Sequence, residues 1–149
     1  MGHKHVAELP MQHHLREPLQ TLVDENPPVS GAILADLDGS DLAYYPEPMK
    51  EALGHSAVFA GVALKRSSVA EKRAGRAPIT EMCVDGERGA FIAVMVGDEH
   101  LILAAMWDHT PAARITEATR RVAERMADLL KLTAKPVEPG LAIDEMNPN

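Results

Sequence analysis

A chain of 149 residues with a formal net charge of −7 is too acidic for the basic stripe that nucleic-acid binders normally carry. This length predicts one domain with a hydrophobic core, and the single cysteine excludes an internal disulfide framework and suits a reducing compartment. The N-terminus lacks the apolar segment of a signal peptide, and each apolar run is far shorter than the roughly 20 residues of a spanning helix. We therefore expect a cytoplasmic protein without membrane insertion.

The first predicted element is a short helix that begins at Met11 or Pro18 and ends at Asn26, before two prolines. We expect residues 1–14 to form a flexible N-terminus. Its histidines have no cysteine or carboxylate at fixed spacing to complete a metal site, so we interpret them as solvated: His3, His5, His13 and His14.

A hairpin follows, in which Val29–Leu37 and Leu42–Tyr45 pair across a turn. Gly39 is expected to supply the positive φ of that turn. Asp36 and Asp38 superficially match a calcium loop, but strands rather than helices flank them, so we expect a plain turn.

The most informative element is a long helix over Met49–Arg73, because its apolar residues form two faces. One face suits the sheet: Met49, Leu53, Ala57, Ala60 and Leu64. The other is nearly opposite: Val58, Phe59, Val62 and Val69. Either a second subunit or a loop of the same chain could cover this second face. Gly54 and Gly61 lie between the faces, where another backbone could approach closely.

Basic residues gather at the end of this helix and in the following loop: Lys65, Arg66, Lys72, Arg73 and Arg76. Basic side chains near a helix C-terminus interact favourably with the helix dipole, and these residues could simply form a solvated face. They could equally form a docking patch for an acidic partner.

A three-strand antiparallel meander is predicted over Ile79–Asp85, Ala90–Val96 and His100–Trp107, because the connections are too short for parallel crossovers. The last two runs are apolar on both pleats and must be covered on both faces. The first run mixes charge with apolar residues, as expected near a sheet edge. A final helix, with Thr110 as N-cap, is predicted to reach Leu132.

No phosphate loop, nucleophile elbow or zinc-protease helix is present in the sequence. Cys83 could pair with His100 or His109, but its strand is expected beside the most buried part of the chain, where inert cysteines are common. We predict no catalytic, cofactor-binding or metal-binding residues, and no enzyme activity.

The order of elements and several segments resemble the roadblock dynein light chain family, including its bacterial members. Leu19-x-x-Leu22 and Pro28–Gly39 are similar to that family's first helix and hairpin. Val84–Ile92 and Leu101–Ala104 are similar to its meander. The resemblance implies an α+β fold: a five-stranded antiparallel sheet with helices on both faces, in roadblock/profilin-like layers over residues 15–132, followed by a flexible tail over 133–149.

The resemblance also implies a homodimer in which the long helix and the first meander strand pair with their symmetry mates. The expected interface residues are Gly54, Val58, Phe59, Gly61, Val62, Val69, Glu81 and Cys83. Bacterial members are non-catalytic signalling partners of Ras-like small GTPases, which implies a GTPase regulator or scaffold with Lys65 and Arg66 as docking candidates. The alternatives are a structural adaptor subunit of a larger complex, or a sensor that binds a small molecule between sheet and helix.

Overall fold

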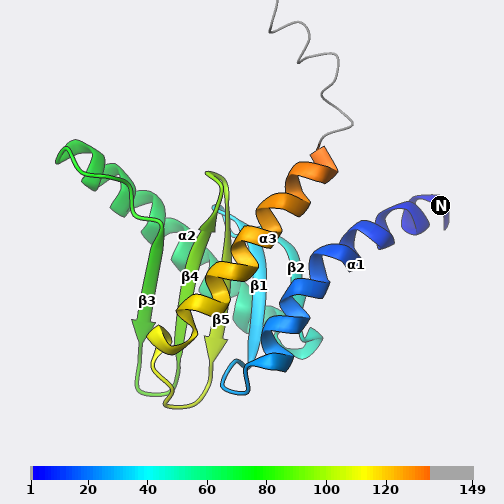
Figure 1. The fold of residues 1–149 in the computed structure, drawn as a ribbon, viewed down its shortest axis with the longest axis horizontal. Coiled ribbons are helices and arrows are strands. Elements are labelled where there is room, and N and C mark those ends of the chain that lie inside the picture. Colours follow the sequence, from blue (N-terminus) through cyan, green and yellow to red (C-terminus); the bar gives the residue numbers. More distant parts are fainter. Residues whose placement is uncertain (1, 135–149) are drawn as a thin grey trace, which may run out of the picture.

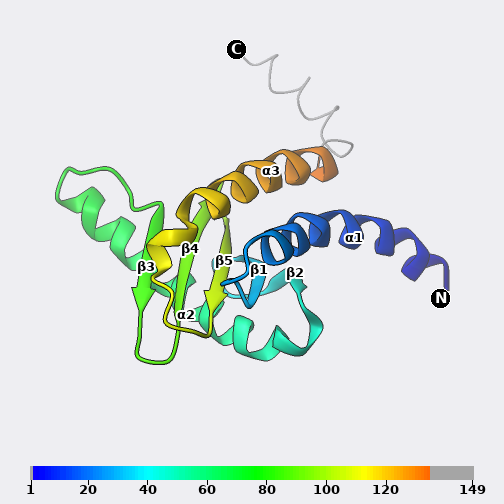
Figure 2. The same ribbon diagram turned by 60° about the horizontal axis from the view of Figure 1, so that its bottom comes forward.

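A computed structural model describes residues 2–134 of the chain, and the side chains of residues 14–131. Its centre is one antiparallel sheet of five strands in the order β2-β1-β5-β4-β3. Helix α2 covers one face, and helices α1 and α3 cover the other (Figures 1 and 2). The elements are α1 (Gly2–Glu25), β1 (Gly31–Asp36), β2 (Asp41–Tyr45), η1 (Glu47–Met49), α2 (Lys50–Arg73), β3 (Glu81–Asp85), β4 (Ala90–Val96), β5 (His100–Met106), η2 (Ala112–Ile115) and α3 (Thr116–Ala134). The predicted α+β sheet with helices on both faces is confirmed.

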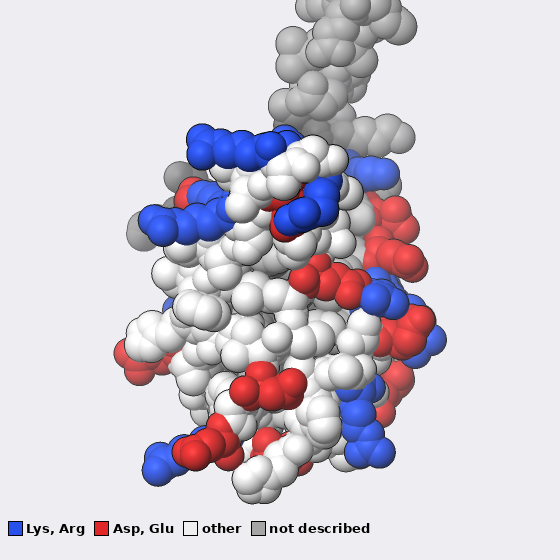
Figure 3. Space-filling view, turned by 90° about the vertical axis from the view of Figure 1, so that its left-hand side faces the viewer, with Lys and Arg blue, Asp and Glu red and all other residues white. Residues whose placement is uncertain are grey.

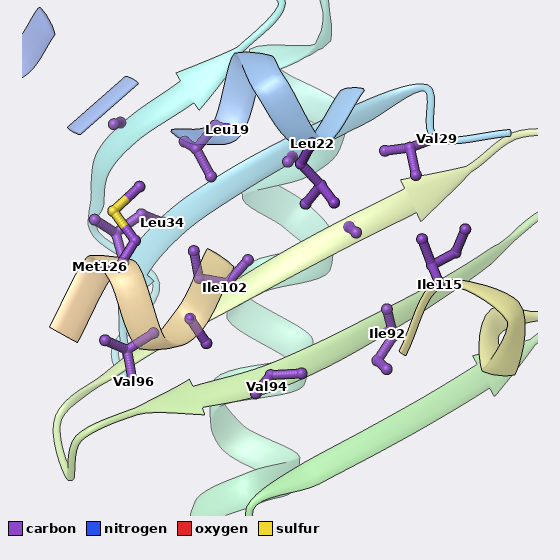
Figure 4. Close-up of a cluster of buried hydrophobic side chains, with 14 of the residues drawn as sticks. Leu19, Leu22, Val29, Leu34, Ile92, Val94, Val96, Ile102, Ile115 and Met126 are labelled. Atoms are coloured by element: carbon purple, nitrogen blue, oxygen red, sulfur yellow. The ribbon is translucent and has the colours of Figure 1, made fainter. Parts of the chain in front are cut away.

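The interior strands alternate between two cores, because successive side chains of a strand point to opposite faces. In β1, Leu34 packs toward α1 and α3, whereas Ile33 packs toward α2. Figure 4 shows the larger core, in which Leu19 of α1 and Met126 of α3 meet Ile102 of β5. This double burial explains why the runs of β4 and β5 are apolar without interruption.

Helix α1 begins earlier than the sequence predicted, and the predicted boundary at residue 14 falls within it. Pro18 lies in the helix interior rather than in the first turn. Leu15, Pro18 and Leu19 are all buried, so apolar packing continues through the proline. That packing offsets the hydrogen bond that the proline ring removes.

The predicted N-cap of the last helix was wrong. A 3-10 turn, η2, precedes α3, and Asp108 Oδ1 accepts a hydrogen bond from the Thr110 backbone N–H at 2.9 Å. Asp85 Oδ1, from the end of β3, accepts one from the Ala112 backbone N–H at 2.8 Å. A residue distant in sequence therefore caps this turn. From residue 135 onward, the predicted tail lies outside the described residues.

No helix in residues 2–134 is both long enough and apolar enough to cross a bilayer.

Candidate functional site

The outward side of α2 carries an apolar surface, which consists of Val58, Phe59, Val62 and Val69. These side chains are 45–55% exposed, whereas Leu53, Ala57, Ala60 and Leu64 on the inward side are buried. No part of the chain within residues 2–134 covers them, so the alternative in which a loop shelters this face was wrong for the described structure. Several exposed apolar side chains on one side of a helix are typical of an interaction site.

Two contacts hold this surface in place. The Phe59 ring meets Phe91 of β4 edge to face, with ring centroids 6.2 Å apart and planes at 81°. Val58 lies against the β1–β2 turn, where Gly39 has φ +95° and a Cβ on it would come within 2.4 Å of Val58 Cγ2. The predicted positive φ at Gly39 is confirmed. Phe59 and Val58 are therefore anchored by the sheet while their outer atoms remain exposed.

The two helix glycines differ in their surroundings. A Cβ on Gly61 would lie 2.3 Å from the carbonyl oxygen of Leu37, so this close approach is within the chain and not between chains. A Cβ on Gly54 would meet nothing within 4 Å. Only Gly54 therefore remains available to another molecule.

Strand β3 is an edge of the sheet, and its free backbone groups can be assigned from the hydrogen bonds that it makes with β4. Thr80 O accepts from Met95 N–H at 2.9 Å, and Gly86 N–H donates to Gly89 O at 2.8 Å. Hydrogen-bonded pairs alternate along an antiparallel ladder, so the N–H and C=O groups of Glu81, Cys83 and Asp85 point away from β4. An unpaired edge of this kind is a template for pairing with another strand.

This edge and α2 lie on the same side of the molecule. Figure 3 shows that side as a broad uncharged surface with Lys and Arg gathered toward its upper end, where α2 ends in Figure 1. One partner could cover the helix face and the strand edge together.

Cys83 is exposed, although β3 lies beside the buried strand β4. Strand β3 is at the edge of the sheet. Helix α3 and the turn η2 contact it on either side of Cys83: Arg120 of α3 pairs with Glu81, and Asp85 caps η2. The strand register places Cys83 level with Ala104 of β5, while His100 lies at the far end of that strand. The thiol and the His100 imidazole are thus not brought together.

The Glu81–Arg120 pair ties β3 to α3. Arg120 donates to both carboxylate oxygens, one of them at 2.8 Å. These hydrogen bonds hold the pKa of the Glu81 carboxyl below its ordinary value, against the opposing effect of partial burial. Glu81 therefore uses its side chain within the chain, although its backbone faces the free edge.

We expect Glu81→Gln to lower the melting temperature by about 2 °C at pH 7, as suits a partly exposed ion pair. Because the folded pKa is depressed, the stabilisation is complete above the unfolded pKa of about 4.3 and is lost as the pH falls through the folded value. Melting curves from pH 7 to acid should thus converge for variant and wild type. Glu87→Gln, in the exposed β3–β4 turn, is the control and should leave the melting temperature unchanged. If Glu81→Gln lowered the melting temperature equally at every pH, the assignment of this ion pair would be contradicted.

The two docking candidates differ in their partners. Lys65 Nζ forms a salt bridge with Asp38 Oδ1 of the β1–β2 turn at 2.6 Å. Arg66 is exposed and forms no salt bridge within the described part of the chain. Lys65 is thus oriented by its own hairpin, and Arg66 is available to another molecule.

Within the described residues, no group of three or more His, Cys, Asp and Glu side chains is arranged to hold a metal ion. A groove of about 420 Å³ lies between α1 and α3 and is lined by Arg121 and Arg125 among others. It lies between two helices, whereas the sensor interpretation placed a ligand between sheet and helix.

No family model matches the chain, and no curated protein matches it in sequence. Its fold resembles solved structures. An MglB structure "with tetrameric arrangement" has a TM-score of 0.67 and 21% identity, covering 80% of this chain and 89% of that one. The gliding protein MglB from Thermus thermophilus has a TM-score of 0.66 and 21% identity, covering 80% and 90%. A Roadblock/LC7 domain from Streptomyces avermitilis has a TM-score of 0.66 and 16% identity, covering 76% and 94%. The fold of this chain is therefore the fold of the roadblock family.

Proposed function

We propose that this protein is a cytoplasmic, homodimeric and non-catalytic regulator or scaffold. It binds a Ras-like small GTPase through the surface of its long helix and modulates the GTPase cycle. The observation that carries the proposal is the apolar surface of α2, exposed on a roadblock fold whose solved relatives include MglB proteins.

Two unpaired surfaces on one side of the molecule support the homodimer. The apolar surface of α2 suits an apolar partner, and the free edge of β3 suits pairing with another strand. A second copy supplies both, because a twofold axis brings each surface against itself. Pairing of β3 with its symmetry mate would join the two sheets.

The basic residues toward the end of α2 support the GTPase contact. A dimer presents two copies of Lys65 and Arg66 beside the shared helices. Guanidinium and ammonium groups fixed near an apolar surface attract an acidic protein and orient it. Asp38 restricts the Lys65 side chain, so less conformational entropy is lost on binding than for a free lysine.

The test uses the purified chain with each purified Ras-like GTPase of the source organism. The rates of GTP hydrolysis and of nucleotide release are measured with and without the chain. At least one GTPase should bind and change one of these rates. The double variant Lys65→Ala/Arg66→Ala should bind about tenfold more weakly while remaining folded and dimeric.

The matched control is Arg121→Ala/Lys131→Ala, which removes the same charge from exposed positions on α3. It should bind like the wild type. Binding with neither rate changed would place the chain among scaffolds. Failure of every GTPase to bind would contradict the proposal.

A further inference from the structure

The groove between α1 and α3 lies on the face of the sheet opposite to α2 (Figure 2). Its volume is about 420 Å³, and no segment within residues 2–134 fills it. Pro18 and Leu22 of α1 supply apolar lining, as do Ala118 and Val122 of α3. The groove is therefore separate from the α2 surface proposed for the GTPase, and it suits a ligand with apolar side chains.

Two arginines of α3 give this groove its charge. Arg121 is exposed and forms no salt bridge within the described part of the chain. Arg125 Nη2 lies 3.7 Å from Glu17 Oε1, and both side chains are more than half exposed, so this ion pair is weak. Among the described residues that line the groove, only Glu25 is acidic. The groove thus favours a ligand that is acidic as well as apolar.

The part of the sequence that follows α3 has this composition. Residues 136–149 contain no lysine or arginine and carry three carboxylates. Leu141–Met146, here called the tail segment, contains two of these carboxylates and three large apolar side chains. The tail segment therefore complements the groove both in charge and in its apolar character.

The chain between α3 and the tail segment is long enough to reach the groove. Helix α3 ends at Ala134, and Arg121 lies thirteen residues earlier, which is about 20 Å along the helix. Asp144 follows Ala134 by ten residues, which span up to about 33 Å when extended. The difference leaves room for the chain to reverse, and Pro139 and Gly140 are residue types that favour turns.

A second groove is also within reach but differs in charge. It has a volume of about 350 Å³ and lies between α3 and the β4–β5 turn. Its lining includes Asp98 and Glu99 of the turn and Lys131 of α3. Two carboxylates there repel an acidic segment, whereas the two arginines of the first groove attract it. Charge therefore selects the groove between α1 and α3.

We propose that the tail segment occupies the groove between α1 and α3 of its own chain. Leu141 and Ile143 contact the apolar lining, and Asp144 pairs with Arg121. A short tether raises the effective concentration of the segment at the groove to about the millimolar range, which favours the segment of the same chain over that of a second copy. The docked segment closes this groove to other acidic ligands. The tail expected over residues 133–149 would then not be flexible throughout.

The test measures how readily a disulfide forms between the tail segment and the groove in the full chain. Thr21→Cys/Ala142→Cys joins the segment to the groove, and Asp98→Cys/Ala142→Cys joins it to the second groove. Cys83→Ser removes the native thiol from both variants. Equilibration with glutathione gives the effective concentration of each cysteine pair. It should be at least about tenfold higher for the pair that includes position 21, and the product should have the mass of a single chain under denaturing conditions.

Charge reversals in the Thr21→Cys/Ala142→Cys variant test the ion pair. Arg121→Glu and Asp144→Arg should each lower the effective concentration about fivefold, and the two together should restore it to within about twofold. Lys131→Glu, which makes the same charge change on α3 in the lining of the second groove, should have little effect.

Equal effective concentrations for the two cysteine pairs would overturn the proposal. Single reversals without effect, or without recovery in the double variant, would overturn it as well. A disulfide that joins two chains would assign the groove to the tail of a second copy and contradict docking within one chain. None of these outcomes depends on whether a GTPase binds, so the proposed function is tested separately.

Discussion

Replacing Phe59 with aspartate should turn the dimer into a monomer. Phe59 is the largest member of the apolar surface of α2 and is 55% exposed in the single chain. In a dimer its carboxylate replacement would be buried without a partner, at a cost far above that of the lost apolar contact. We expect the dissociation constant to rise by at least about 100-fold, which sedimentation velocity would detect as a single-chain species.

Phe59 also touches Phe91, so its replacement could weaken the fold as well as the interface. Val62→Arg separates the two effects, because it adds a charge in the middle of the apolar surface of α2. Ser67→Asp adds a charge at an exposed position of the same helix outside the apolar surface. Val62→Arg should be monomeric and Ser67→Asp dimeric, with thermal melts showing that both are folded. An unaltered dimer for Phe59→Asp and Val62→Arg would remove the assignment of this surface.

Replacing Gly61 with alanine should destabilise the protein by about 3 kcal/mol, in the range of overpacked cores. Alanine normally stabilises a helix interior by about 1 kcal/mol relative to glycine. Here its Cβ would lie 2.3 Å from the Leu37 carbonyl oxygen and 3.0 Å from the Leu37 carbonyl carbon. Both atoms belong to the backbone next to the β1–β2 turn, so the helix or the hairpin must move.

Gly54→Ala is the matched control, because it makes the same change in the same helix with open space around the new Cβ. Urea unfolding at one fixed protein concentration should show a loss for Gly61→Ala and no loss of monomer stability for Gly54→Ala. If the dimer brings another backbone against Gly54, Gly54→Ala should instead raise the dissociation constant of the dimer. Equal gains in stability for both variants would contradict the packing of α2 against the hairpin.

The sheet could be predicted from the sequence because its signals are local. Apolar runs without alternation identified β4 and β5 as interior strands, and short turns made them antiparallel. The mixed composition before Asp85 placed β3 near an edge. The two apolar faces of α2 followed from the helical period alone, so the exposed valines and Phe59 could be named in advance.

Contacts between distant segments could not be predicted in this way. Asp85 caps η2 across the β4–β5 hairpin, and this displaced Thr110 from the role that its position suggested. Gly61 is explained by a carbonyl group of the β1–β2 hairpin, which helical spacing does not reveal. The exposure of Cys83 depends on where η2 and α3 cross the sheet.

The pairing of two copies through α2 and the edge of β3 is tested most directly by the mass of the purified chain in solution. Light scattering coupled to size exclusion, over a wide range of concentrations, should give twice the chain mass of 16.1 kDa. Phe59→Asp in the same experiment should give the mass of a single chain. A soluble wild-type protein that keeps the single-chain mass at the highest concentration would contradict the account.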